Sequence, residues 1–448
     1  MIATLLIVMA QAIGASAGPL EPRPLPADTS PLQARVDAAP DGASVDVGPG
    51  VYRGDLTLDR PVRLIGHGRP LLEGSGKGSV VRIRGPQVTV EGFDIDGREG
   101  GRLEADSSGI HVAAEGATIR DCRIRRSLFG IYLLEANGAR IERCVVDGMR
   151  GRDPGEQGSG IHVFNTTHFA LIGNEVRYAR DGFYLQSSSE GRITGNIVTD
   201  VRYGLHYMYS DDNVFEDNLF QRSDAGAAVM YSRRIQFRRN RFIHNRGFAS
   251  VGLLMQACED IVAEDNLIAD NARGVFLEGS TRNAFRRNAI LESDTALVLY
   301  DSNRDVRFVG NVFSGNLSPL LLVGRHTDTV FDGNFWSDHD EPDLDGDGVR
   351  DRPYRLSNVF DHLRGNLTAA DLFAQGFGAS VLGAAERMFP VLELSPVLDA
   401  HPLARAPELA AVPAPPAGTD HASGLGIVIA LSCLGGGLTI LRVRGARR

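Results

Sequence analysis

A stripe of histidine and tyrosine residues recurs at one position of a repeating unit in the middle of the chain. The third residue of successive glycine-led runs is His111, Tyr132, His162, Tyr184 and His206, and Ala228, Leu254, Phe276 and Val298 continue the series. The residue before each of the first five is apolar and is expected to point inward, so alternation along a strand directs the stripe outward. The sequence therefore predicts an outer face that carries metal-binding or partner-binding side chains.

Two methionines lie beside the last histidine of the stripe. Met208 follows His206 by two positions and so shares its face, and Met230 lies one repeat later. Met255 joins them if the longer repeat before it preserves the register. Imidazole and thioether groups are soft ligands that suit copper, particularly Cu(I). The sequence predicts a copper site at His206, Met208, Met230 and His162.

The same face has a second interpretation, as a surface that packs against a loop or docks a partner. Aromatic side chains gather near the methionines, and contiguous apolar surface is typical of interaction sites. The residues assigned to this docking face are Tyr184, Tyr207, Tyr209 and Tyr231. From the stripe alone, both interpretations stay open.

An aspartate-rich run further along the chain resembles part of a calcium-binding loop. Asp343, Asp345, Asp347 and Asp351 occupy positions 1, 3, 5 and 9 of such a loop, with glycine at position 6. Tyr354 stands at position 12, where an EF-hand has glutamate, so a complete EF-hand is excluded. A calcium clip and a plain Asp/Gly turn both fit the pattern.

The four cysteines are too few for a disulfide scaffold and show no CxxC spacing of a zinc site. Cys122 and Cys144 lie 22 residues apart, which is one repeat. Neighbouring strands bring such residues within the Cα separation that a disulfide allows. They also occupy a buried position where a small polar side chain suffices, so buried thiols are favoured over a disulfide or copper ligands.

The repeat explains how these residues are positioned. Short β-like runs carry asparagine at a fixed place, with successive gaps of 22, 22, 22, 26, 22, 23 and 23 residues: Asn174, Asn196, Asn218, Asn240, Asn266, Asn288, Asn311 and Asn334. Upstream, Phe93, Cys122 and Cys144 hold the same place. Short strands at this period without helical spacing are typical of a solenoid. We predict an all-β, right-handed parallel β-helix of about eleven coils, similar to pectate lyases, over residues 28–340.

The predicted solenoid has additions at both ends. Residues 32–39 read as an amphipathic helix that caps the first coil, and residues 341–403 form a C-terminal extension with the Asp/Gly loop. Residues 1–17 resemble a secretory signal peptide with an A-x-A cleavage site, although no Lys or Arg precedes the apolar run; a buried first helix is the alternative.

The C-terminal residues predict a membrane anchor. Residues 404–423 form a Pro/Ala linker, and residues 424–441 are 18 uncharged residues. Such a helix reaches roughly 27 Å, just enough to cross the hydrocarbon layer. Four arginines among residues 442–448 favour a cytoplasmic C-terminus. The body is then periplasmic or otherwise extracytoplasmic, tethered to the cytoplasmic membrane.

The net charge and the order of the motifs argue against two classes of function, nucleic-acid binding and polysaccharide cleavage. The net charge is −9, and without the four terminal arginines the remainder carries −13, which argues against a protein built to hold nucleic acid. All basic residues but Lys77 are arginine. Asp211–Asp212 and Gly66–Gly68 superficially resemble polygalacturonase motifs, but the Gly-His-Gly precedes the aspartates and is about 145 residues away. We expect no enzyme; a polysaccharide lyase or hydrolase, or a surface binding protein, remains the alternative.

Several longer runs resemble the NosD family. They are residues 203–213 (YGLHYMYSDDN), 227–232 (AAVMYS), 333–338 (GNFWSD) with 352–355 (RPYR), and 386–392 (ERMFPVL). The resemblance extends from about residue 32 to residue 403, whereas the hydrophobic tail has no counterpart that we can match. It supports the β-helix and implies copper binding, and it brings no catalytic residues.

The resemblance also implies a place in denitrification. Members of the family are periplasmic maturation factors for nitrous oxide reductase, and they help to build its copper-sulfide centre. They work with an ABC-type ATPase and permease, NosF and NosY, and with the copper chaperone NosL. The partners expected for this chain are therefore that transporter, that chaperone, the reductase and, through the tail, the membrane.

Overall fold

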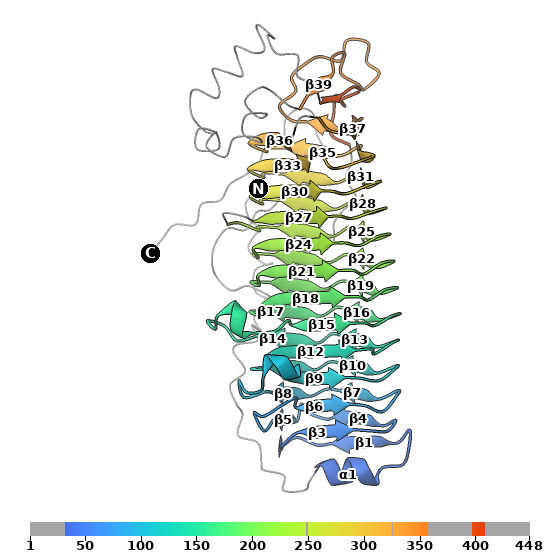
Figure 1. Cartoon of the computed structure of the whole chain (residues 1–448), viewed down its shortest axis with the longest axis vertical. Coiled ribbons are helices and arrows are strands. Elements are labelled where there is room, and N and C mark those ends of the chain that lie inside the picture. The colour runs from blue at the N-terminus through green and yellow to red at the C-terminus, as the bar shows by residue number, and fades with distance from the viewer. Residues whose placement is uncertain (1–31, 248–249, 325, 357–396, 408–448) are drawn as a thin grey trace, which may run out of the picture. The chain divides into compact units, whose positions relative to one another are not determined.

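The computed structural model describes residues 32–247, 250–324, 326–356 and 397–407. In Figure 1 these residues form a stack of coils, in which a coil takes one strand from each of three sheets, except that the last coil has no strand in the third sheet. This is the predicted right-handed parallel β-helix. The second sheet has 13 strands, so the stack has thirteen coils where about eleven were expected. The earliest coils were undercounted because Gly50 and Pro70, not asparagine, precede their second strands.

The strands of each sheet follow one another at intervals of three along the chain, except for β39, which pairs antiparallel with β40 at the end of the first sheet. The first sheet contains β1 (Ser44–Val47), β4 (Arg63–Gly66), β7 (Thr89–Glu91), β10 (Thr118–Arg120), β13 (Arg140–Glu142), β16 (Ala170–Ile172), β19 (Arg192–Thr194), β22 (Val214–Glu216), β25 (Gln236–Arg238), β28 (Val262–Glu264), β31 (Ala284–Arg286), β34 (Val306–Val309), β37 (Thr329–Asp332), β40 (Leu398–Asp399) and β39 (Tyr354–Arg355). The second sheet contains β2 (Val51–Arg53), β5 (Leu71–Glu73), β8 (Asp94–Asp96), β11 (Arg123–Arg125), β14 (Val145–Asp147), β17 (Glu175–Arg177), β20 (Ile197–Thr199), β23 (Leu219–Gln221), β26 (Arg241–Ile243), β29 (Leu267–Ala269), β32 (Ala289–Leu291), β35 (Val312–Ser314) and β38 (Phe335–Trp336). The third sheet contains β3 (Leu56–Leu58), β6 (Val81–Ile83), β9 (Ser108–Val112), β12 (Phe129–Leu134), β15 (Ile161–Phe164), β18 (Asp181–Gln186), β21 (Tyr203–Met208), β24 (Ala225–Met230), β27 (Val251–Gln256), β30 (Arg273–Glu278), β33 (Thr295–Tyr300) and β36 (Ser318–Val323).

The predicted asparagine column is a continuous hydrogen-bonded ladder inside the stack. In each asparagine of the ladder before the last, the backbone N–H and the side-chain Nδ2 both donate to Oδ1 of the asparagine one coil later, as from Asn196 to Asn218 at 3.0 and 2.9 Å. Nδ2 also donates to a backbone carbonyl, which for Asn196 is that of Leu171. These bonds satisfy polar groups at a buried bend, where an unpaired donor is costly.

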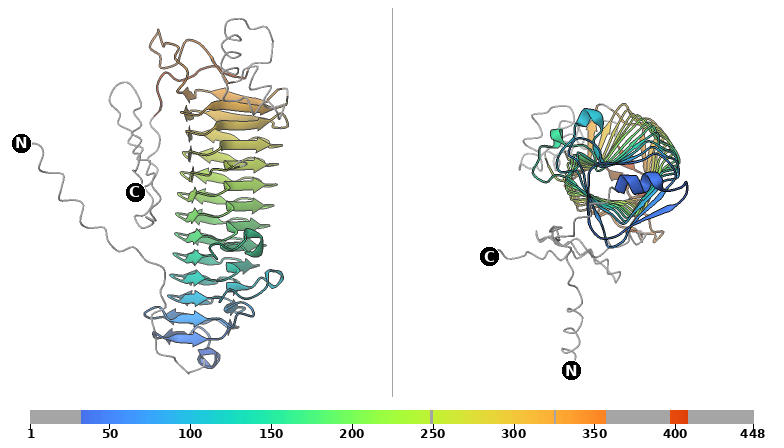
Figure 2. Two further views of the ribbon diagram at one scale, coloured as in Figure 1. Left: turned by 90° about the vertical axis from the view of Figure 1, so that its left-hand side faces the viewer. Right: turned by 90° about the horizontal axis from the view of Figure 1, so that it is seen from below.

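Short elements cover both ends of the ladder and core. α1 (Leu32–Ala38) buries Leu32 and Val36 at the first coil, as predicted, and lies across that end in Figure 2. At the other end, Asp399 in β40 is fully buried and accepts hydrogen bonds from the last ladder member, Asn334. The ladder therefore ends on a carboxylate supplied by the C-terminal extension.

Arginine–aspartate pairs on the corners give six of the arginines a structural role. In each pair, an arginine donates through two nitrogens to both oxygens of an aspartate 22 residues earlier: Arg143–Asp121, Arg222–Asp200, Arg234–Asp212, Arg239–Asp217, Arg282–Asp260 and Arg287–Asp265. All twelve residues have positive φ, and the two members of each pair occupy equivalent turns of successive coils. A planar guanidinium fits such a two-point contact, whereas a lysine ammonium does not.

Several predicted segments lie outside the described residues. These are the signal peptide (1–17), most of the linker (404–423), the anchor (424–441), the basic tail (442–448) and the family-like run 386–392. Among the residues that the structure describes, no helix has the length and apolar character to cross a membrane.

Candidate metal site

The predicted stripe lies on the outer face of the third sheet, in the register expected. Tyr132 pairs with His111 and His162, and Tyr184 pairs with His162 and His206. Neighbouring ring centroids along the stripe are 5.3, 4.3, 4.4 and 4.7 Å apart. The five rings thus form one contiguous column, which Ala228, Leu254, Phe276 and Val298 extend.

The two methionines are brought together beside the column. Met208 pairs with Met230 across adjacent strands, and both side chains are partly exposed. Met255 does not join them, because it pairs with Val229 and is fully buried in the core. The 26-residue repeat places Gln256, not Met255, above Met230.

The assignment of Tyr207 to the docking face is wrong. Tyr207 is fully buried, and its hydroxyl donates to the Ser210 carbonyl at 2.8 Å. It lies between His206 and Met208, and alternation along the strand turns it into the core. By contrast, Tyr209 and Tyr231 are 53% and 46% exposed, and their rings stack with centroids 5.1 Å apart.

His206 is held by a buried carboxylate and two aromatic rings. Its Nδ1 lies 3.2 Å from Oδ2 of Asp181, which is fully buried and also accepts two hydrogen bonds from Arg202 at 2.8 and 2.7 Å. Tyr184 and Tyr203 meet the imidazole edge-on at 4.7 and 5.1 Å. Burial would raise the pKa of Asp181, but hydrogen bonds from His206 and Arg202 outweigh it and lower that pKa.

His162, predicted as a fourth ligand, has a different environment. Its ring is stacked between Tyr132 and Tyr184, Phe129 lies against it at 5.5 Å, and its Nδ1 is buried without a hydrogen-bond partner. Burial lowers the pKa of His162 to about 3. Tyr184 separates it from His206, so the structure does not bring His162 to the methionines.

Loops cover the early part of the stripe. The outward-facing residues Leu128, Phe129, Tyr132 and Met149 form a second apolar cluster, separate from the core. Leu103, the first residue of η1 (Leu103–Ala105), packs against it, and Met149 precedes η2 (Pro154–Glu156) in the other loop. The packing interpretation therefore applies to the early coils, whereas the part from Tyr184 to Met230 stays more open.

A replacement of His162 by phenylalanine tests the distinction between the two histidines. In the wild-type protein, the unfolded state binds a proton at this histidine below pH 6.5, while the folded state does so only near pH 3. The contribution of the neutral His162 to the free energy of unfolding is therefore complete above pH 6.5. It falls by about 1.4 kcal/mol per pH unit as the pH is lowered toward 3. We expect His162→Phe to reduce this fall in urea unfolding between pH 7 and 4.5, with Cu(I) binding unchanged. An unchanged pH dependence would contradict the buried, neutral imidazole.

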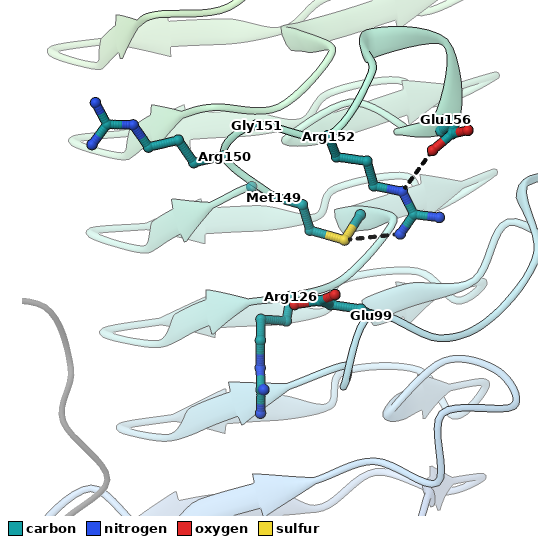
Figure 3. Close-up of a pocket in the computed structure, with 8 residues that line it drawn as sticks. Glu99, Arg126, Met149, Arg150, Gly151, Arg152 and Glu156 are labelled. Atoms are coloured by element: carbon teal, nitrogen blue, oxygen red, sulfur yellow. Dashed lines mark hydrogen bonds and ion pairs between the residues drawn. The ribbon is translucent and has the colours of Figure 1, made fainter.

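One pocket lies among the early coils, away from the open part of the stripe. It has a volume of about 460 Å³ and is lined by residues of the 148–156 loop with Glu99 and Arg126 (Figure 3). Arg152 donates to Glu156 at 3.3 Å and to the Met149 sulfur at 3.2 Å, and Arg126 is paired with Asp96. Two of its arginines are thus already neutralised by carboxylates.

The aspartate-rich loop uses its carboxylates within the loop. Ligand oxygens of Asp343, Asp345 and Asp347 lie within 4.8 Å of one another, while Asp351 accepts from the Leu344 backbone N–H at 2.8 Å. Asp343 likewise accepts from two glycine N–H groups. These are the bonds of a plain Asp/Gly turn, and calcium binding stays a prediction.

The cysteines among the described residues are buried free thiols, as favoured from the sequence. Cys122 and Cys144 continue the asparagine ladder, since the Cys144 backbone N–H donates to Asn174. Cys258 is also buried, and burial raises its pKa to about 12, which suppresses the thiolate that binds metals.

The donor set at the open stripe fits copper. Among the described residues, the only group of three or more His, Cys, Asp or Glu side chains close enough to share a metal is the Asp343 loop. A metal held on the stripe by three side chains would therefore need a ligand of another type. The thioethers of Met208 and Met230 lie on the same face as the His206 imidazole. One imidazole and two thioethers favour Cu(I) over hard cations.

Sequence reasoning missed Asp181, Arg202 and Tyr203, which surround His206. Asp181 immediately precedes the glycine-led run of its coil, and that position was not compared between coils. Aligning it would have placed Asp181 beneath Tyr203, its partner in the sheet.

Comparisons with known proteins show which family model, relatives and solved structures the chain is similar to. Residues 148–341 match a family model described as "Periplasmic copper-binding protein (NosD)". The chain is 30% identical to proteins named "Probable ABC transporter binding protein NosD" from Stutzerimonas stutzeri and Pseudomonas aeruginosa. The alignments cover 77% and 85% of this chain and 83% and 93% of those proteins. A solved PL6 alginate lyase is 14% identical over 68% of this chain and 81% of its own, with a TM-score of 0.52, which shows the fold alone.

Proposed function

The chain belongs to the NosD family, and from this premise we propose that it is a periplasmic maturation factor for nitrous oxide reductase. In this role it handles copper as cargo for the copper-sulfide centre, together with an ABC transporter and a copper chaperone. The family description supports a periplasmic, copper-binding protein. The names of the relatives support association with an ABC transporter.

One observation carries the copper role. His206, Met208 and Met230 lie on one open face, and Asp181 and two tyrosines hold the imidazole in place. A partly exposed site with neutral thioether ligands suits transfer better than permanent storage, because a partner's ligands can approach it. The exposed pair Tyr209 and Tyr231 borders the methionines and offers aromatic surface for such a partner.

We also propose that the protein is not an enzyme. The carboxylates of Asp211 and Asp212, the motif closest to that of a hydrolase, are paired with Arg233 and Arg234. The hydrogen bond from Arg234 lowers the pKa of Asp212, opposite to the shift that a general acid needs. Gly66 ends β4, whereas Asp212 precedes β22, which lies six strands further along the same sheet, roughly 29 Å at strand spacing.

The copper content of nitrous oxide reductase tests the proposal. We expect reductase from cells that lack this gene to be poor in copper, and the wild-type gene to restore it. A gene encoding His206→Ala, Met208→Ala and Met230→Ala should restore it only weakly, because the copper ligands are gone. Gln186→Ala with Gln256→Ala is the matched control, since these residues flank the methionines in the same column. Full copper content of the reductase in cells without the gene would contradict the maturation role. A polysaccharide enzyme would give that result.

A further inference from the structure

We propose that Asp181, supported by Arg202, is a positioning residue that makes His206 a copper ligand through Nε2. The buried carboxylate holds the proton of the imidazole on Nδ1, and the other ring nitrogen is left with its lone pair free. This inference rests on the copper role proposed above and names the atom through which His206 acts.

The direction of the hydrogen bond follows from the charge of Asp181. An ionised carboxylate only accepts, and Asp181 already receives two bonds from the Arg202 guanidinium, which keeps it ionised. His206 Nδ1, 3.2 Å from Oδ2, must therefore be the donor. Metal-binding histidines commonly donate their second N–H to a carboxylate in this way, which fixes the tautomer and raises the basicity of the ligand nitrogen.

The aromatic neighbours fix the orientation of the ring as well. Tyr184 and Tyr203 meet the imidazole at interplanar angles of 80° and 87°. The Arg202 guanidinium lies 4.5 Å from the centre of the Tyr203 ring, so one arginine supports both the carboxylate and the tyrosine. The His206 side chain is still 15% exposed, which leaves an approach to the ring.

The stripe contains an internal comparison two coils earlier. His162 occupies the same column, and the place equivalent to Asp181, three residues before the tyrosine that pairs with the histidine, is taken by Phe129. There the Nδ1 atom has no partner and the ring is buried. A carboxylate therefore stands at this place beside His206, which lies next to the methionines, whereas a phenylalanine stands there beside the enclosed His162.

Nitrogen NMR of histidine-labelled protein without metal tests the tautomer directly. At pH 8, where an ordinary imidazole is neutral, we expect His206 to carry its proton on Nδ1. In Asp181→Asn the amide can donate to Nδ1, so the Nε2–H form should increase and Cu(I) affinity should fall about 10- to 100-fold. Asp200→Asn is the matched control, because Asp200 receives the same two-nitrogen contact from Arg222 but touches no histidine.

The outcomes separate this inference from the copper role. A wild-type His206 protonated on Nε2 overturns the inference even if Asp181→Asn does not fold. A folded Asp181→Asn variant with wild-type tautomer and affinity also overturns it, while a loss of Cu(I) in His206→Ala preserves the copper role. If His206→Ala binds Cu(I) as the wild-type protein does, the copper role of this histidine fails first.

Discussion

Purified protein with His206→Ala, Met208→Ala and Met230→Ala is expected to bind Cu(I) about 100-fold more weakly than the wild-type protein, or worse. Loss of a residue that merely orients a ligand already costs about 10- to 100-fold in metal affinity, so loss of three ligands must cost more. Competition with a coloured Cu(I) chelator measures the difference. The buried free thiols of Cys122, Cys144 and Cys258 are unchanged in this variant and do not replace the lost ligands.

The matched control for this experiment keeps the methionines and alters their neighbours. Gln186 pairs with Met208 and Gln256 pairs with Met230, so both occupy the same outward column. Gln186→Ala with Gln256→Ala should retain the wild-type Cu(I) affinity. Equal affinities in all three proteins would place the copper site elsewhere and remove the main support for the proposed role.

Replacement of Asp399 by alanine is expected to destabilise the C-terminal end of the stack by about 3 kcal/mol or more. One oxygen of this fully buried carboxylate accepts from the Asn334 backbone N–H, from Asn334 Nδ2 and from Trp336 Nε1, at 2.9 to 3.0 Å. Without it, three buried donors lose their acceptor, and each costs about 1–3 kcal/mol. The disturbance should begin at the last coil, because coils stabilise mainly their neighbours.

The single tryptophan reports this loss directly. Trp336 is 1% exposed and stacks on Phe313 and Tyr354, so its fluorescence follows the end of the stack in urea. Asp399→Asn, which keeps an oxygen acceptor, should recover most of the stability. Asp332→Ala is the surface control, because the Asp332 side chain is 52% exposed and forms an ion pair with His401 at the surface. A tryptophan transition unchanged in Asp399→Ala would show that the carboxylate does not terminate the ladder.

The features that depend on the repeat period could be predicted from the sequence. A fixed spacing converts positions in the chain into columns, so the stripe from His111 to His206, the Met208–Met230 pair and the asparagine ladder were all predicted in register. The same rule, applied to every residue of β21, would have sent Tyr207 into the core. Tyr207 was assigned to the docking face because it is a tyrosine, like its neighbours there, and not because its position in the strand points outward.

The missed features depend on contacts between different columns. Asp181 lies 25 residues before His206 and one strand away, and nothing in its local sequence shows that its side chain reaches the next coil. The burial of His162 involves Phe129, which lies against the imidazole from another column of the sheet. The excess of arginine was visible in the composition, but the two-nitrogen pairing with aspartate one coil below required the structure.

X-ray absorption of the full-length protein loaded with one equivalent of Cu(I) tests the central claim most directly. The donor set at His206, Met208 and Met230 predicts a first shell with one imidazole nitrogen and two thioether sulfurs, and the sulfurs should disappear when both methionines are replaced. A first shell without sulfur, or one that keeps its sulfurs in the Met208→Ala and Met230→Ala variant, would contradict copper handling on this face.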